Sequence, residues 1–142
     1  MLLDYQAFLF SYRRASYGVY LKYGINKFEL QFLLMLSGYL RCIGKQVIAK
    51  NEFFDTSTGN PREHRKMLGY LGGCLDKRFI GSYEYIKKPG SLSIGISNLG
   101  LSVISHFEKD LLKYMDRFNP RDNKAFAVDL SVLTLYRERI AA

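Results

Sequence analysis

The sequence predicts a mainly α-helical chain with one small β-hairpin. Three observations lead to this fold class. Long stretches at both ends have helical apolar periodicity, and a sharply capped helix follows Asn60. A run of β-forming residues is interrupted by a turn at 88–91. The 142 residues fit one domain of ordinary size, 1–142, which is long enough to bury a core.

The first two helices are expected at 2–23 and from 27 to about 43. Residues 2–23 contain no proline and a single glycine, Gly18. Their apolar side chains extend around more of the helix than one buried stripe requires, so a second packing partner is expected. Gly24 and Asn26 predict a helix end and a new N-cap, and the helix that follows has a buried pattern.

A compact segment follows Gly44. We expect a short helix from Lys45 to about Phe54, with free backbone amides at its start that can meet a phosphate. Residues 55–59, Asp-Thr-Ser-Thr-Gly, have the composition of a turn. The inward side chains expected on the short helix are Val47, Ile48 and Phe53.

The helix after Asn60 has the sharpest local signal in the sequence. Asn60 suits the N-cap, Pro61 suits the first helical position, and the Glu63 carboxylate can bond back to the cap. The helix is expected to end near Arg78. Its predicted inward side chains are His64, Leu68, Leu71 and Leu75. Its predicted outward residues are Arg62, Lys66, Gly69 and Gly73, flanked by Arg65 and Tyr70.

This helix contains three glycines, Gly69, Gly72 and Gly73, although each costs about 1 kcal/mol of helix propensity against alanine. Because Gly69 and Gly73 are expected on the outward face, close backbone approach is one explanation for them. A helix that bends or stops early is the other.

A β-hairpin and two helices are expected after the capped helix. Residues 79–87 are rich in β-formers, 92–97 alternate with a period of two, and Pro89 followed by Gly90 suits a tight turn. The predicted helices run from Ser97 or Asn98 to a point before Asn119, and over about 123–140.

The net charge of +8 is concentrated in the middle of the chain, where residues 41–96 carry ten Lys and Arg against five acidic residues. A localised positive charge attracts polyanions, of which nucleic acid is the commonest large one. The alternative is a basic surface that serves solubility alone.

The predicted order is that of a winged helix-turn-helix, whose recognition helix, at about 60–78, enters the major groove while the hairpin 79–97 is the wing. The alternatives are an ordinary amphipathic helix with a basic polar face and a charged hairpin that only solubilises. The residues expected to read base edges or adjacent phosphates are Arg62, Arg65 and Lys66. Those expected to bond the DNA backbone are Thr56, Ser57 and Asn60. Those expected to reach phosphates are Lys45, Lys87, Lys88 and Ser91.

Residues from about 27 to 107 resemble the MarR family of winged-helix transcription regulators. Leu75-Asp76-Lys77-Arg78-Phe79-Ile80 is similar to the family's passage from recognition helix into wing. The segment 92–100 is similar to its second wing strand and to the Ser-x-x-Gly start of the next helix. The sequence departs from the family in its three recognition-helix glycines and in lacking an Asp-x-Arg pair between Tyr83 and Ser91.

The resemblance implies a homodimer of a sequence-specific, double-stranded DNA-binding transcription regulator. The winged-helix lobe would cover 27–107, and a helical dimerisation lobe would comprise 1–23 and 108–142. The resemblance also implies that an aromatic cleft between these lobes could hold a small apolar or phenolic effector. The alternatives are packing of the terminal helices within a monomer, a winged-helix protein-interaction module, and a replication or mobile-element accessory protein.

We expect no enzyme, no cofactor and no metal site. His64 is expected to be packed or capping, and His106 is expected on a solvated face. Cys42 and Cys74 form no disulfide framework, which together with the absence of a signal peptide favours the cytoplasm. Both thiols are expected to behave as small buried apolar residues. The alternative for them is a redox role, favoured at Cys42 by the nearby Arg41.

Overall fold

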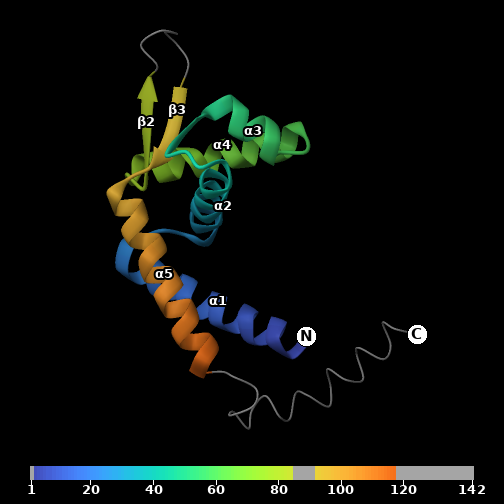
Figure 1. Cartoon of the computed structure of the whole chain (residues 1–142), viewed down its shortest axis with the longest axis vertical. Coiled ribbons are helices and arrows are strands. Elements are labelled where there is room, and N and C mark those ends of the chain that lie inside the picture. The colour runs from blue at the N-terminus through green and yellow to red at the C-terminus, as the bar shows by residue number, and fades with distance from the viewer. Residues whose placement is uncertain (1, 85–91, 118–142) are drawn as a thin grey trace, which may run out of the picture. The chain divides into compact units, whose positions relative to one another are not determined.

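The computed structural model describes residues 2–84 and 92–117 of the chain. The chain divides into two compact units, Tyr20–Ser105 and the pair Met1–Val19 with His106–Ala142. The predicted fold class is confirmed, since helices and one small sheet make up the structure (Figure 1). The elements are α1 Leu2–Tyr23, α2 Lys27–Ile43, β1 Val47–Ala49, α3 Lys50–Ser57, α4 Pro61–Asp76, β2 Ile80–Glu84, β3 Leu92–Ile96 and α5 Asn98–Arg117.

Helix α2 begins and ends where the sequence predicts. The Asn26 side chain accepts hydrogen bonds from the amides of Phe28 and Glu29, at 3.0 and 2.8 Å. The Glu29 carboxylate in turn accepts from the Asn26 amide at 3.0 Å, which completes a capping box. Gly44 ends the helix in the left-handed conformation, with φ at 67°.

The short helix predicted from Lys45 to Phe54 is wrong in its first half. Val47–Ala49 forms the strand β1, and helix α3 begins only at Lys50. β1 pairs antiparallel with β3, so that Ile48 lies opposite Ile94. Ile48 is buried as expected, but Val47 is exposed rather than inward. Two β-branched residues in succession suit a strand better than a helix start.

The turn predicted at 55–59 is shorter than expected, because α3 continues through Ser57. The Thr56 hydroxyl donates to the Glu52 carbonyl at 2.9 Å, and the Ser57 hydroxyl donates to the Phe53 carbonyl at 2.6 Å. Such bonds to the carbonyl four residues back let hydroxyl side chains remain in a helix.

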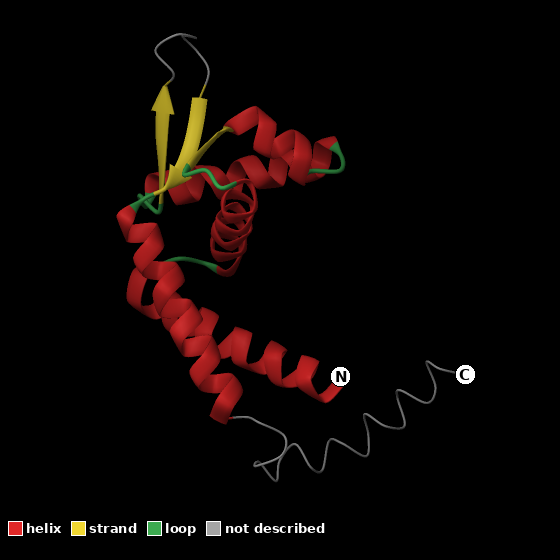
Figure 2. Cartoon of the chain, viewed as in Figure 1, coloured by secondary structure: helices red, strands yellow, loops and turns green. Residues whose placement is uncertain are grey.

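The sheet of the larger unit has the strand order β1-β3-β2 (Figure 2). β2 and β3 form the predicted antiparallel hairpin, in which Ile80 pairs with Ile96 and Gly81 with Gly95. The predicted turn at 88–91 lies outside the described residues.

The core of this unit lies where α2, α3 and α4 meet. Phe32, Phe53 and Phe54 are fully buried, with the rings of Phe32 and Phe53 edge to face at 5.7 Å. The rings of Phe53 and Phe54 are also edge to face, at 5.9 Å. These buried aromatic pairs fix α3 against α2, and α3 in turn leads directly into α4.

A second packed junction joins the end of α4 to the start of α5. Arg78 adopts the left-handed conformation, with φ at 66°, and ends α4. The Ser97 hydroxyl donates to the Arg78 carbonyl at 2.5 Å and accepts from the Gly100 amide at 3.0 Å, so Ser97 is the cap of α5. A Cβ on Gly100 would lie 2.1 Å from the Phe79 carbonyl oxygen. The Ser-x-x-Gly sequence therefore combines a cap with a close backbone approach.

The smaller unit contains most of α1 and the end of α5. The rings of Tyr12 and Phe107 meet edge to face at 5.2 Å, and Ala15 is fully buried. The helix predicted over 123–140 lies outside the described residues. Within 2–84 and 92–117, no helix combines the length and hydropathy needed to cross a membrane.

Candidate nucleic-acid interface

Helix α4 is rotated relative to the prediction. Its fully packed side chains are Met67, Leu71 and Cys74. The predicted inward residues His64, Leu68 and Leu75 are only half-buried. The periodicity therefore located the helix correctly but placed the buried stripe too far to one side. Arg62, Arg65, Lys66 and Gly69 are exposed.

Gly73 is not on the outward face, and the prediction for it is wrong. A Cβ at Gly73 would lie 2.1 Å from Oε2 of Glu29, a carboxylate that is almost fully buried on α2. Glu29 also pairs with Nζ of Lys77 at 2.7 Å. Gly73 thus allows α4 to approach α2. Gly69 and Gly72 have no atom within 4 Å of an added Cβ.

Because an added Cβ meets Glu29 at Gly73 and no atom at Gly72, alanine at these two positions should have opposite effects on the free energy of unfolding. Gly72→Ala should raise the free energy of unfolding by about 0.5–1 kcal/mol, because it gains helix propensity without a clash. Gly73→Ala should lower it by about 1–2 kcal/mol, because Glu29 must withdraw from its amide and lysine partners. Urea unfolding of both variants measures the difference, and equal effects would contradict the assigned packing.

The N-terminus of α4 is capped as predicted, with one difference. Oδ1 of Asn60 accepts from the Glu63 amide at 2.8 Å, and Pro61 occupies the first turn. The Glu63 carboxylate accepts from the Gly59 amide at 3.2 Å, whereas the sequence predicted a bond to the amide of the cap itself. The Asn60 cap bond uses only its oxygen, and its side-chain NH₂ retains the ability to donate.

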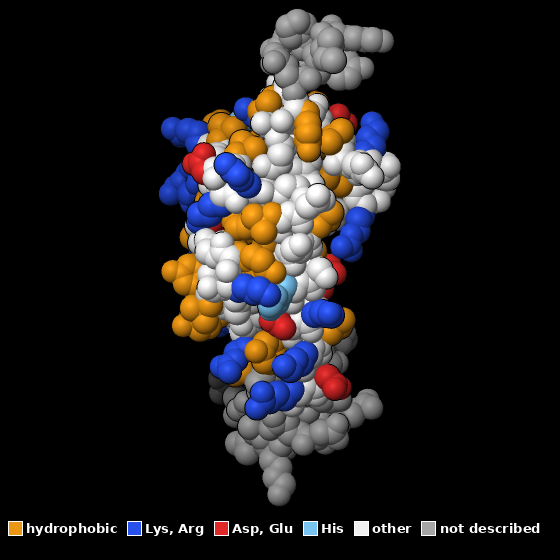
Figure 3. Space-filling model, turned by 90° about the vertical axis from the view of Figure 1, so that its left-hand side faces the viewer, with side chains coloured by type: hydrophobic (Ala, Val, Ile, Leu, Met, Phe, Trp, Pro, Cys, Tyr) orange, Lys and Arg blue, Asp and Glu red, His pale blue; other side chains and the backbone are white. Residues whose placement is uncertain are grey.

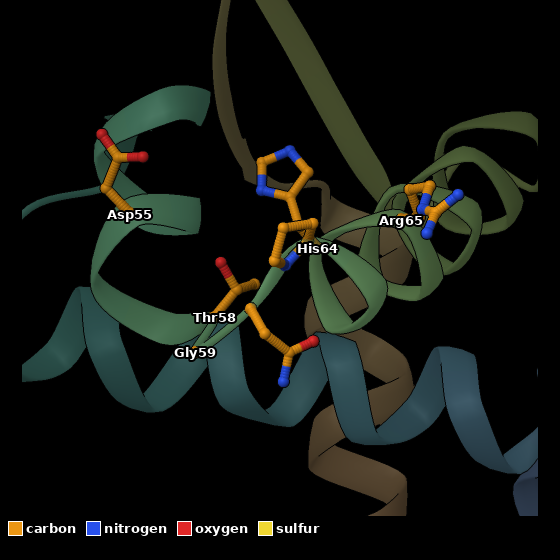
Figure 4. A pocket seen from close by; sticks show the side chains of 7 residues that line it. Asp55, Thr58, Gly59, His64 and Arg65 are labelled. Carbon is orange, nitrogen blue, oxygen red and sulfur yellow. The ribbon is translucent and has the colours of Figure 1, made fainter.

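An open hollow of about 500 Å³ lies at this end of α4. Its lining comes from α3, the α3–α4 turn and the first turn of α4: Asp55, Thr58, Gly59, Asn60, Pro61, His64 and Arg65. Asp55 and His64 come from the two helices, while Arg65 lies on the side of α4 away from Asp55 (Figure 4). The His64 ring packs 5.0 Å from that of Phe54, in keeping with its predicted packed role.

The exposed side of α4 is basic. In the described part of the chain, Arg62, Arg65 and Lys66 take part in none of the ion pairs. Guanidinium and ammonium groups that face water can exchange hydration for a phosphate or a base edge. Basic side chains also outnumber acidic ones on the face of the molecule drawn in Figure 3.

The other predicted site residues are not all placed with α4. Lys45 is exposed in the loop between α2 and β1, so its expected position at a helix N-terminus is wrong. The hydroxyls of Thr56 and Ser57 already donate to helix carbonyls. Lys87, Lys88 and Ser91 lie outside the described residues.

The two thiols differ in environment. Cys74 is fully buried and lies 3.5 Å from the Glu29 carbonyl. Burial raises the pKa of Cys74 to about 12, with a further rise from the Glu29 charge that Lys77 partly opposes. Cys42 is exposed, so the expectation that both thiols are buried is wrong for Cys42.

A thiol-reactive disulfide reagent should therefore modify Cys42 in the folded protein at about pH 8 and Cys74 only after unfolding.

The raised pKa of Cys74 also makes the free energy of unfolding depend on pH. The unfolded thiol ionises near 9.0 and the folded one near 12, so the unfolded state binds fewer protons between these values. The free energy of unfolding should then fall as pH rises from 9 toward 12, and Cys74→Ala should reduce that fall. Rapid reaction of Cys74 in the folded protein would contradict the burial.

His106 lies on α5, half-buried rather than solvated as the sequence predicted. Its Nε2 lies 3.1 Å from Oδ2 of Asp110, one helical turn along. Among the described residues, no group of three His, Cys, Asp or Glu side chains could hold a metal ion.

No family model and no curated protein matches this sequence. Solved structures do match. The MepR–DNA complex of S. aureus superposes with a TM-score of 0.61 at 11% identity, over 92% of this chain and 91% of that one. The YusO protein of Bacillus subtilis superposes with a TM-score of 0.59 at 12% identity, over 97% of this chain and 92% of that one. A mutant of MarR from E. coli, complexed with operator DNA, superposes with a TM-score of 0.55 at 9% identity, over 93% of this chain and 88% of that one.

These likenesses establish the class of fold. The chain has a winged-helix fold, in which the hairpin β2–β3 follows α4 and pairs with β1. Its architecture is the winged helix of MarR-type regulators.

Proposed function

We propose that this protein is a sequence-specific, double-stranded DNA-binding transcription regulator that acts as a homodimer. The observation that carries the proposal is the exposed basic side of α4. It is formed by Arg62, Arg65 and Lys66, in the first two turns after the Asn60 cap. Support comes from MepR and MarR, which share the fold and were solved with DNA.

In this proposal α4 enters the major groove. Arg62 and Arg65 lie in its first turns, from which a guanidinium can bond O6 and N7 of a guanine together. Lys66 supplies a point charge for a phosphate, and the Asn60 NH₂ donates to another. To bond the DNA, the hydroxyls of Thr56 and Ser57 would have to give up their present hydrogen bonds to helix carbonyls and donate to a phosphate oxygen instead.

The wing is the second proposed contact. We assign the segment 79–97 to the DNA backbone or minor groove, with Lys87, Lys88 and Ser91 as its proposed contact residues. Their contribution is electrostatic and independent of base sequence, so Lys88→Ala should weaken binding to every duplex by a similar factor.

The proposed dimer uses α1, as the excess apolar surface of residues 2–23 predicts. Tyr5 and Leu9 are 58% and 46% exposed on α1, and Leu112 is 69% exposed on α5. Large apolar side chains with this much exposure on terminal helices favour a further helix–helix contact. A second copy of the chain is the proposed partner.

Leu9→Glu should therefore shift the protein toward monomer. A glutamate buried in an apolar dimer contact would lose hydration, so dimer affinity should fall at least about tenfold. Sedimentation velocity measures the change against a chain mass of 16.4 kDa. Gln31→Glu adds the same charge to an exposed position of α2 and should leave the dimer intact. A monomeric wild type at micromolar concentration would contradict the dimer.

Binding of the full chain to labelled random duplex DNA, followed by fluorescence anisotropy at increasing salt, tests the proposal. We expect binding that weakens steeply with salt, and a slope about one unit shallower for Lys66→Ala. Lys109→Ala removes an equal charge from exposed α5 and should keep the wild-type slope. No binding to duplex DNA at low salt would overturn the proposal and favour a protein-interaction module.

A further inference from the structure

The first turn of α2 packs along one side of the C-terminal half of α4. The residues of α4 that meet this turn and the loop before it recur at helical spacing: Tyr70, Gly73, Cys74 and Lys77. The Tyr70 ring stacks on that of Phe28, with 5.3 Å between their centroids and 6° between their planes. The Cys74 thiol donates to the Glu29 carbonyl at 3.5 Å. Positions three, four and seven residues apart share a side of a helix, so one stripe of α4 makes all of these contacts.

Glu29 lies at the centre of this contact and is only 4% exposed. Its Oε1 accepts from the Asn26 amide at 3.0 Å and from the Lys77 ammonium at 2.7 Å. Lys77 also donates to the Gly24 carbonyl at 2.9 Å, which holds the pair against the loop before α2. The carboxylate is therefore fixed in place by bonds that any withdrawal would break.

Gly73 provides the surface against which the Glu29 carboxylate lies. A Cβ there would lie 2.1 Å from Oε2 and 3.1 Å from the carboxyl carbon. A methyl group at this position can be accommodated only if Glu29 gives up its bonds or α4 moves away from α2. Close-packed interiors transmit such displacements. The separation of the two helices at this point thus depends on the absence of a side chain at position 73.

The cations proposed to meet DNA lie on the same side of α4, nearer its start. Lys66 and Arg62 precede Gly73 by two and three helical turns, so at 100° per residue each lies within about 20° of it around the helix. Both cations are exposed, whereas Glu29 covers this side of the helix at Gly73. Lys66 and Gly73 are about 10 Å apart along the helix. A tilt of α4 about its contact with Glu29 therefore moves both cations.

We infer that Glu29 and Gly73 are a positioning pair, which fixes the tilt of α4 and thereby the sequence preference of the protein. The inference rests on the proposed function, since it concerns the helix that would read base edges. Glu29 acts through α4 and by its volume, because its charge is already engaged by Lys77. Base contacts tolerate a displacement of only about 0.5 Å, whereas the attraction between cations and phosphates is less demanding. Tilting α4 should therefore reduce sequence preference more than general affinity for duplex DNA.

Gly73→Ala tests the pair through the ratio of two affinities, one for a preferred duplex and one for a random duplex. Fluorescence anisotropy should show this ratio reduced about fivefold to tenfold, the scale of one lost base contact. Both affinities come from the same folded population, so a loss of stability alone leaves the ratio unchanged. Gly72→Ala is the matched control, since it adds the same methyl group where no atom lies within 4 Å, and it should keep the ratio.

Two variants of Glu29 separate its volume from its charge. Adding Glu29→Ala to Gly73→Ala vacates the space that the new methyl group needs, so the ratio should rise at least about threefold over Gly73→Ala alone. Glu29→Gln keeps the volume and an acceptor for the Asn26 amide, and should stay within about twofold of the wild-type ratio. A double variant without recovery, or a glutamine variant as impaired as Gly73→Ala, would overturn the inference.

Amide NMR signals of the ¹⁵N-labelled full chain provide a readout without DNA. In Gly73→Ala the signals of 62–66 should shift, although they lie two to three turns from the substitution, and Glu29→Ala should bring them back toward the wild type. Shifts confined to the residues next to 73 and 29 would contradict the movement of α4. A wild type that binds no duplex would overturn the proposed function, and the amide shifts would then decide by themselves whether Glu29 positions α4.

Discussion

Replacing Gly100 with alanine should lower the free energy of unfolding by about 2–4 kcal/mol. The new methyl group would lie 2.1 Å from the Phe79 carbonyl oxygen and 2.8 Å from the Ile96 side chain. A backbone carbonyl cannot rotate away as a side chain can, so α5 would have to separate from the end of α4. Separation would also break the bond from the Ser97 hydroxyl to the Arg78 carbonyl and the bond from the Ser97 amide to the Phe79 carbonyl.

Urea unfolding followed by circular dichroism measures this effect. Gly38→Ala is the matched control, since an added Cβ there meets nothing within 4 Å and α2 gains helix propensity. The control should be stabilised by up to about 1 kcal/mol. If Gly100→Ala unfolded within about 0.5 kcal/mol of the wild type, the close approach of α5 to Phe79 would be contradicted.

Arg65→Ala should weaken binding to a preferred duplex by about tenfold to a hundredfold, as expected for loss of a bidentate base contact. Arg65 is exposed beside the capped start of α4, where a recognition helix meets base edges. Anisotropy with the preferred duplex and with random duplex separates the two contributions. The loss should be larger for the preferred sequence.

Arg65→Lys is the informative companion variant. Lysine keeps the charge but cannot form the planar pair of bonds. Compared with Arg65→Ala, the lysine variant should retain more of the affinity for random duplex but little more of the sequence preference. If alanine and lysine at position 65 reduced binding to both duplexes equally, the assignment of Arg65 to a base edge would be contradicted.

Local signals in the sequence predicted the ends of helices well. Asn26, Gly44 and Asn60 act through hydrogen bonds and backbone conformations that involve only their immediate neighbours. β1 was missed because it is three residues long and exists only through pairing with β3, a distant segment. Such a strand has no periodicity of its own to detect.

The sequence predicted the exposure of the α4 cations better than the direction of its glycines. Charge and helical spacing placed Arg62, Arg65 and Lys66 on the exposed side of α4, and they are exposed. The sequence placed Gly73 on the outward face because the contact that buries it comes from Glu29 on α2, a separate helix far away in the sequence.

Selection of bound duplexes from a random pool tests the central claim most directly. The full chain should enrich one motif with two inverted half-sites, whose centres lie about 10 base pairs apart or a multiple of that. Such a motif would reflect both base readout by α4 and the two-fold symmetry of the proposed dimer. A pool that retains random sequence after repeated selection, although duplex is bound, would contradict sequence-specific recognition.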